Sequence, residues 1–169
     1  MSEIKISEHP SHEQLLAQLR ALLQPGESLL THMANMSSLL YWSLPDVNWV
    51  GFYLRDGETL HLGPFQGKPA CTLIPVGNGV CGTAAREQRT MHVPDVHAFP
   101  GHIACDSASN AEVVVPVIHA GEVWGVLDVD SPIAGRFTEA DVHLLEMAAR
   151  LLEEHCASAA GRLFMLDKA

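Results

Sequence analysis

Residues 113–130 read VVVPVIHAGEVWGVLDVD, and this stretch indicates the class of fold. Two apolar runs, Val113–Ile118 and Val123–Val129, flank a short turn at Ala120 and Gly121, which is the pattern of an antiparallel β-hairpin. A sheet with an apolar face needs a second layer to cover it, and in mixed domains helices supply that layer. The hairpin therefore predicts an antiparallel sheet, whose helices and other strands must come from the neighbouring sequence.

The segment before the hairpin contains both helix and strand patterns. Leucines and methionines at helical spacing predict helices over about residues 11–23 and 27–41, separated by the Pro25-Gly26 break. The stretch GNGVCGTAARE, residues 77–87, has the pattern of a loop that enters a short helix. Strand patterns occur at three places, residues 48–54, 59–62 and 90–93.

The segment after the hairpin predicts a long final helix. Thr138 stands at its N-cap position, with Phe137 before it and Asp141 at the capping-box position. The apolar stripe of this helix consists of Val142, Leu145, Ala149 and Leu152. This order of elements predicts one α+β domain over residues 1–169, in which a central antiparallel sheet has helices packed on one face.

Composition argues against two classes of partner. The chain has 20 acidic and 10 basic residues, a formal net charge of −10 and no cluster of Lys and Arg, which disfavours nucleic acid and anionic membranes. No apolar run approaches the roughly 18 residues that a membrane span needs. The N-terminal sequence lacks the apolar stretch of a secretory signal, so we expect a cytoplasmic protein with reduced cysteines.

The four cysteines form no CxxC pair, and their neighbours differ. Cys105 lies in the polar loop HIACDSASNAE, residues 102–112, where a thiol is exposed enough to react. Cys81 stands at a predicted helix start, where the helix dipole favours the thiolate. Cys71 begins a short apolar run, and Cys156 has the pattern of a packing residue. A zinc site that uses Cys81, His97, His102 and Cys105 is improbable, because their spacing fits no standard pattern.

Acidic residues stand where two predicted strands meet this loop. Because side chains alternate along a strand, Asp128 and Asp130 share a face, and mutual repulsion tends to raise the pKa of at least one. The alternative is a solvated strand end. Glu112 lies at the mouth of the next strand, where it could hold an ammonium group or supply a proton. Backbone N–H groups of the polar turn around Ser109 could hold a carboxylate.

The strand over residues 48–54 carries two aromatic residues on one face. Trp49 and Tyr53 flank Gly51, whose missing side chain leaves a slot over the backbone. Such a slot suits a methyl or thioether group, because sulfur packs well beside aromatic rings. The alternative is that both rings simply pack beneath a helix.

Five segments together resemble the free methionine-(R)-sulfoxide reductases, which are built on a single GAF domain. They are DVNWVGFYL, GPFQGKPAC, IPVGNGVCGTA, HIACDSASNAE and GVLDVDSP. The resemblance runs from about Ala34 to Leu152, and its three-cysteine pattern is more specific than the scaffold. It implies a GAF core over about residues 34–155, preceded by a helical segment at about residues 11–41.

The resemblance also implies an activity, the reduction of the R epimer of free L-methionine sulfoxide. Cys105 would attack the sulfoxide sulfur, and an acid would protonate the sulfoxide oxygen as the S–O bond breaks. The family places acidic residues around the amino group and the sulfoxide oxygen of its substrate, and an aromatic pocket around the methylthio end. The residues that match the acidic positions are Glu112, Asp128 and Asp130. Those that match the aromatic pocket are Trp49 and Tyr53.

By the same resemblance, the sulfenic acid left on Cys105 is captured by a second thiol as a disulfide. Cys71 would resolve it, with Cys81 as a second relay or a reserve thiol, and thioredoxin would restore the dithiol. No metal or organic cofactor is required, and a homodimer is expected. The main alternative is a GAF module that only senses a small ligand, although 169 residues leave no room for an output domain.

Overall fold

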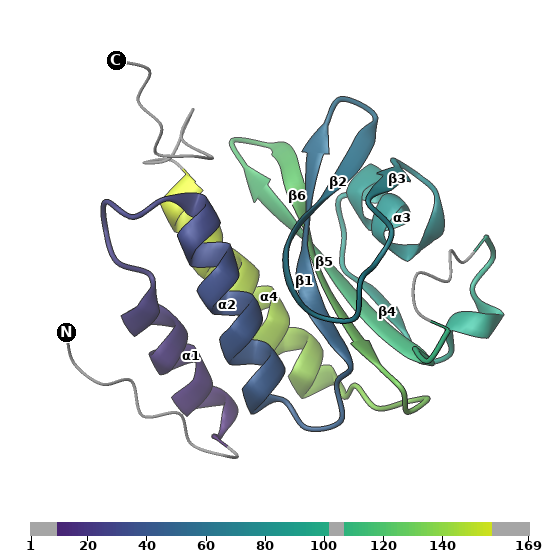
Figure 1. The fold of residues 1–169 in the computed structure, drawn as a ribbon, viewed down its shortest axis with the longest axis horizontal. Helices are drawn as coiled ribbons and strands as arrows, with labels where there is room; N and C mark the ends of the chain where they lie inside the picture. The colour runs from purple at the N-terminus through teal and green to yellow at the C-terminus, as the bar shows by residue number, and fades with distance from the viewer. Residues whose placement is uncertain (1–9, 102–106, 157–169) are drawn as a thin grey trace.

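The computed structural model describes residues 10–101 and 107–156. Its centre is a six-stranded sheet in the order β3-β2-β1-β6-β5-β4, in which neighbouring strands are antiparallel (Figure 1). The strands are β1 (Trp49–Asp56), β2 (Thr59–Gly67), β3 (Leu73–Pro75), β4 (Met91–Val93), β5 (Ala111–His119) and β6 (Glu122–Ser131). The predicted hairpin is thus the pair β5–β6, and β6 lies beside β1 at the middle of the sheet.

Three helices cover one face of the sheet: α1 (His12–Leu22), α2 (Leu29–Ser43) and α4 (Glu139–Cys156) (Figure 1). Each begins at a capping residue. Ser11 and Gln14 form a capping box, Ser28 accepts from the Thr31 N–H, and the predicted Thr138–Asp141 pair caps α4. Their leucines and methionines form one buried core with the helix-facing residues of β1, β5 and β6.

The fold class is confirmed, with one difference in the layers. The short helix α3 (Gly79–Glu87) packs on the opposite face of the sheet. There Val80 and Ala84 join a second buried core with Trp49 and Tyr53 of β1. A sheet whose two faces both carry apolar side chains needs cover on both sides, which is why this helix does not join the other three.

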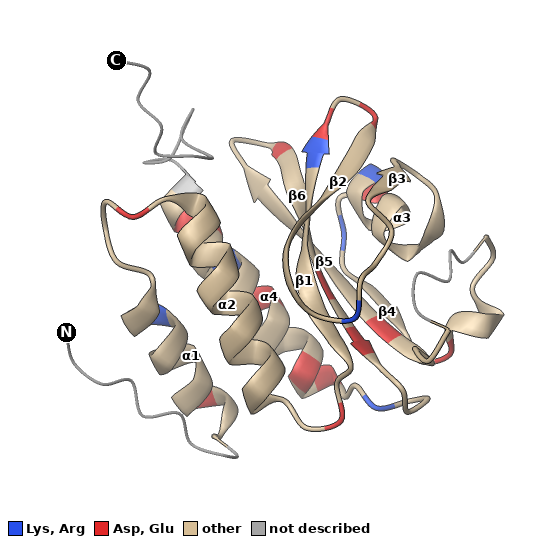
Figure 2. Cartoon of the chain, viewed as in Figure 1, with Lys and Arg blue, Asp and Glu red and all other residues tan. Residues whose placement is uncertain are grey.

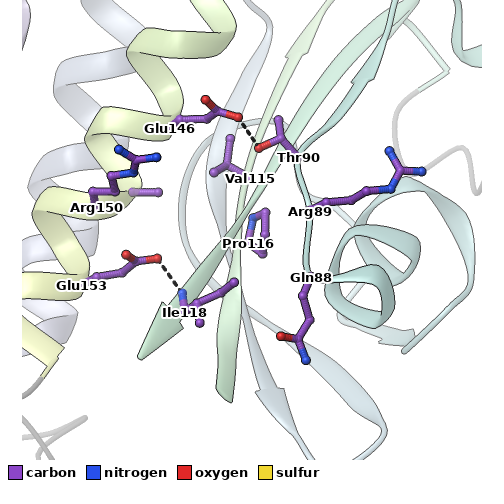
Figure 3. A pocket seen from close by; sticks show the side chains of 10 residues that line it. Gln88, Arg89, Thr90, Val115, Pro116, Ile118, Glu146, Arg150 and Glu153 are labelled. Carbon is purple, nitrogen blue, oxygen red and sulfur yellow. Dashed lines mark hydrogen bonds between the residues drawn. The ribbon is translucent and has the colours of Figure 1, made fainter. Parts of the chain in front are cut away.

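The outer edge of β5 is only partly covered by another strand. The short strand β4 pairs with Glu112–Val114, and beyond it lies a cleft of about 420 Å³ between α4 and the turn after α3 (Figure 3). In that cleft the Ile118 N–H donates to Glu153 Oε1 of α4 at 2.6 Å. Pro116 lacks a backbone N–H, so it presents no unpaired donor at this edge. Both features protect an edge that could otherwise pair with another chain.

Charged residues are spread thinly along the described chain. Acidic residues appear on helices, turns and the central strands, whereas Lys and Arg are few and scattered (Figure 2). The described chain contains no helix long and apolar enough to cross a membrane.

Candidate active site

The sheet register brings the predicted acidic residues together on the face that α3 covers. Glu112 of β5 lies opposite Asp130 of β6, and Asp128 lies between Val114 of β5 and Gly51 of β1. Glu112 and Asp128 are each only 6% exposed, and Asp130 is half-buried. These carboxyl groups therefore do not form a solvated strand end, which was the alternative that the sequence left open.

Burial favours the protonated form of both carboxyl groups in the Glu112–Asp128 pair. Burial raises the pKa of Asp128 to about 7, while hydrogen bonds from Cys81 and Glu112 oppose the shift. The pKa of Glu112 is raised well above its usual range by burial and by the negative charges of Asp128 and Asp130. Asp128 Oδ1 has no hydrogen-bond partner among the described residues, so it remains an acceptor for a bound group.

Cys81 lies in the first turn of α3 and contacts this pair. Its side chain is buried, and its Sγ donates to Glu112 Oε1 at 3.9 Å. The expectation that the helix dipole would favour a thiolate here is wrong. Burial and the charges of Asp128 and Glu112 raise the pKa of the Cys81 thiol well above its usual range, because they outweigh the dipole of one short helix.

Cys81, Glu112 and Asp128 also form the one candidate metal-ligand group within the described chain. One ligand atom from each lies within 4.8 Å of the others. Because burial raises the pKa of all three groups, a metal ion would have to displace protons in order to bind. This group differs from the zinc ligands considered from the sequence, which were Cys81, His97, His102 and Cys105. Of those, His97 bonds Asn110 instead, with His97 Nε2 2.8 Å from Asn110 Oδ1, and His102 and Cys105 lie outside the described residues.

The two predicted aromatic residues form a stacked wall beside the acids. Trp49 stacks on Tyr53 with ring centroids 5.9 Å apart, and on Phe65 of β2 at 5.3 Å. The slot expected over Gly51 is not empty. A Cβ built on Gly51 would lie 2.5 Å from Trp49 Cη2, so the indole itself covers this glycine. Both rings belong to the buried core that also contains Val80 and Ala84 of α3.

Hydrogen bonds join this wall to the segment that carries Cys71. Trp49 Nε1 donates to the Lys68 carbonyl at 3.1 Å, and the Tyr53 hydroxyl donates to the Cys71 carbonyl at 3.0 Å. Cys71 is half-buried and disulfide-bonded, whereas Cys81 is a free thiol. The predicted nucleophile Cys105 lies outside the described residues.

The residues just before β5, at the C-terminal end of the loop over residues 102–112, are held by polar contacts that the sequence did not reveal. Ser109 is buried, and its Oγ accepts from Asn48 Nδ2 at 3.2 Å. Asn110 accepts from the Val96 N–H through its carbonyl oxygen and donates through Nδ2 to the Pro132 carbonyl. Asn48 and Asn110 lie within two of the quoted family segments, but their contacts were not predictable from them because each contact depends on segments that are distant in the sequence.

Comparison with known proteins identifies the family. The chain matches the GAF domain over residues 13–155. It is 51% identical to the free methionine-R-sulfoxide reductase of Escherichia coli over 138 residues, which is 82% of this chain and 84% of the relative. It is 44% identical to the enzyme of that name from Saccharomyces cerevisiae over 152 residues, 85% of this chain and 84% of the relative.

A solved structure supports the same assignment. The free methionine-R-sulfoxide reductase of Neisseria meningitidis, in complex with its substrate, superposes with a TM-score of 0.89 at 36% identity. The match covers 94% of this chain and 99% of that one. The chain therefore belongs to the free methionine-R-sulfoxide reductases, a family of oxidoreductases built on the GAF domain.

Proposed function

We propose that the protein reduces free L-methionine (R)-S-oxide to L-methionine through a cysteine nucleophile, a sulfenic acid and an intramolecular disulfide that thioredoxin reduces. The observation that carries this proposal is the Glu112–Asp128 pair, which is buried on the face that also carries the aromatic wall, so that the pKa of both carboxyl groups is raised. Sulfoxide reduction needs such an acid, because the sulfoxide oxygen accepts a proton as the S–O bond breaks.

The proposed reaction balances in three steps. The Cys105 thiol takes the oxygen atom of the sulfoxide, which releases methionine and leaves a cysteine sulfenic acid. The Cys71 thiol then attacks that sulfur, so that a disulfide forms and water leaves. Reduced thioredoxin returns both thiols and is itself oxidised to a disulfide. The disulfide-bonded state of Cys71 and the free thiol of Cys81 support Cys71 as the resolving residue.

Different side chains of the site would bind different groups of the substrate. The Asp128 and Asp130 carboxylates would hold the ammonium group, for which the unpartnered Asp128 Oδ1 is available. Glu112 would provide the proton for the sulfoxide oxygen, because it is as deeply buried as Asp128 and its pKa is raised well above the usual range. Trp49 and Tyr53 would border the methylthio end, and the segment around Ser109 would hold the carboxylate.

Selectivity for the free amino acid follows from this division. A site that binds both the ammonium and the carboxylate group of its substrate leaves no place for the two peptide bonds of a protein-bound residue. The test is an assay, with thioredoxin and its reductase, on the free R epimer, the free S epimer and a peptide that contains methionine sulfoxide. We expect turnover of the free R epimer alone. Binding without turnover would favour a ligand-sensing GAF module and overturn the proposal.

Two partners belong to the same proposal. Thioredoxin would be the electron donor, and without it the protein should complete one turnover per site and stop. Cys71 is half-buried and not fully enclosed, which suits exchange with a second protein. This dependence fits a cytoplasmic location. We also propose a homodimer, which sedimentation equilibrium of the full chain would test.

A further inference from the structure

Cys81 has contacts that suit hydrogen bonding better than electron relay. Its side chain is 4% exposed, and its Sγ faces Glu112 Oε1. The helix that carries it is held at its start: Thr83 Oγ1 donates to the Gly79 carbonyl at 2.6 Å, and Arg86 Nη2 donates to the Val76 carbonyl at 3.0 Å. A relay thiol must exchange with another disulfide, which requires access that a buried sulfur on a fixed helix lacks.

We propose that Cys81 is a positioning residue, whose thiol donates a hydrogen bond into the Glu112–Asp128 pair and thereby sets the pH at which that pair loses its shared proton. This inference rests on the proposed function, since the pair is the proposed acid of the reaction. It assigns Cys81 a role without any oxidation of its sulfur, in place of the relay role that the family resemblance implies.

The groups around the Glu112–Asp128 pair explain why a weak donor such as the Cys81 thiol can affect its titration. The titratable groups that face one another here come from four elements: Tyr53 of β1, Cys81 of α3, Glu112 of β5, and Asp128 and Asp130 of β6. The described part of this cluster contains no Lys, Arg or His that would compensate the carboxylates. Neutral donors are therefore the groups that stabilise a negative charge on the pair, and Cys81 is one of them.

The direction of its effect follows from simple electrostatics. A donor hydrogen bond favours the ionised carboxylate, so the Cys81 thiol opposes the upward shift that burial imposes on Asp128 and Glu112. Without it, the pair should keep its proton to higher pH. A hydrogen bond inside a buried, low-dielectric cluster is stronger than the same bond in water, so the loss should be measurable.

The test is an infrared titration of the full chain without substrate. The C=O stretching band of protonated carboxyl groups is followed against pH, and its assignment is checked with Glu112→Gln. In Cys81→Ala we expect the midpoint of this band to move upward by about half a pH unit to one unit. In Cys81→Ser, which keeps a donor, it should lie closer to the original value. Thr83→Ala perturbs the same helix without removing the donor, and should leave the midpoint in place.

Two outcomes would overturn the inference. The first is an unchanged midpoint in a folded Cys81→Ala protein, with folding checked by circular dichroism. The second is a Cys81→Ala enzyme that completes one turnover but cannot be regenerated by thioredoxin, because that result would assign Cys81 a relay role. The titration uses no substrate. A protein that shows the shift but reduces no sulfoxide would therefore refute the proposed function and leave the inference about Cys81 standing.

Discussion

Glu112 on β5 shares a hydrogen bond with Asp128 on β6, although the strand register places Glu112 opposite Asp130 and Asp128 opposite Val114. The two acids are therefore diagonal neighbours on one face of the sheet, at a separation that long side chains can span. Because both are buried, one proton shared between them costs less than two negative charges side by side.

Replacement of the proposed acid should impair catalysis more than binding. We expect Glu112→Gln to lower kcat by about 100-fold to 10,000-fold, the range for loss of a general acid, with a smaller change in KM. The thioredoxin-linked assay on the free R epimer measures both. Glu122→Gln changes an exposed glutamate at the start of β6 and should have no effect. Equal losses in the two variants would contradict the assignment.

The same pair should make the protein less stable as the pH rises. Folding raises the pKa of Asp128 from 3.8 to about 7, so its stabilising contribution is complete below pH 3.8 and is lost as the pH rises through about 7. Between these values the free energy of unfolding should fall by at most about 1.4 kcal/mol per pH unit from this group. Urea unfolding at several pH values measures it.

Asp128→Asn provides the comparison for this titration. An amide does not ionise, so the difference in unfolding free energy between the variant and the original protein should change with pH over the same interval. Asp141 contributes in the opposite direction, because Thr138 and Arg136 lower its pKa, and both proteins share that contribution. A difference that stays constant across this interval would mean that Asp128 does not titrate there.

The aromatic wall should be sensitive to one added methyl group. Gly51→Ala places a Cβ against both the Phe65 Cβ and the Trp49 indole, so the stack of Trp49 on Phe65 must shift. Overpacking of this kind costs about 1–3 kcal/mol of unfolding free energy. We also expect KM for the sulfoxide to rise. Denaturant unfolding and the tryptophan fluorescence spectrum test the first point, and an unaltered spectrum with unaltered stability would contradict it.

The disulfide should identify the resolving thiol. After one turnover without thioredoxin, peptide mapping by mass spectrometry should find Cys71 linked to Cys105, with Cys81 as a free thiol. Cys105→Ser should abolish turnover and leave Cys71 reduced. A dominant link between Cys81 and Cys105 would instead make Cys81 the resolving residue. Full activity of Cys105→Ser would remove the proposed nucleophile altogether.

The edge of β5 should depend on Glu153. Glu153→Lys removes the acceptor of the half-buried Ile118 N–H, at a cost of about 1 kcal/mol, the usual net contribution of one hydrogen bond. The exposed edge should also promote association between chains. Thermal unfolding and light scattering measure the two effects. Glu154→Lys makes the same charge change at the exposed neighbouring position and is the matched control; equal behaviour of the two variants would show that charge alone is responsible.

Local patterns in the sequence were sufficient for most of the fold. The Pro25-Gly26 break, the Thr138–Asp141 cap and the hairpin around Ala120 and Gly121 each depend on residues close together in the chain, and each is present in the structure. The length of β2 was underestimated. The sequence predicted a strand over residues 59–62, whereas β2 continues through Gly63 and Pro64 to Gly67. Glycine and proline normally end a strand, and here pairing with β1 overrides that preference.

The candidate site was only partly visible in the sequence. Alternation along β6 was enough to place Asp128 and Asp130 on one face, and the five family segments contain the three cysteines to which the proposed reaction assigns roles. Burial was not visible, because it depends on α3 covering that face of the sheet. This cover reverses the expected state of Cys81, whose thiol is buried against two acids and not activated at a helix end.

The sequence by itself determined the α+β class, the family and the residue types of the site, because turns, caps and motifs are local. Tertiary structure decided which side chains meet. A register shift in the β1–β2 pair between Gly51 and Tyr53 brings Phe65 opposite Gly51 and so completes the stack on Trp49. Since a slip of one residue moves a side chain to the other face of a sheet, that contact depends on a long-range pairing that periodicity cannot reveal.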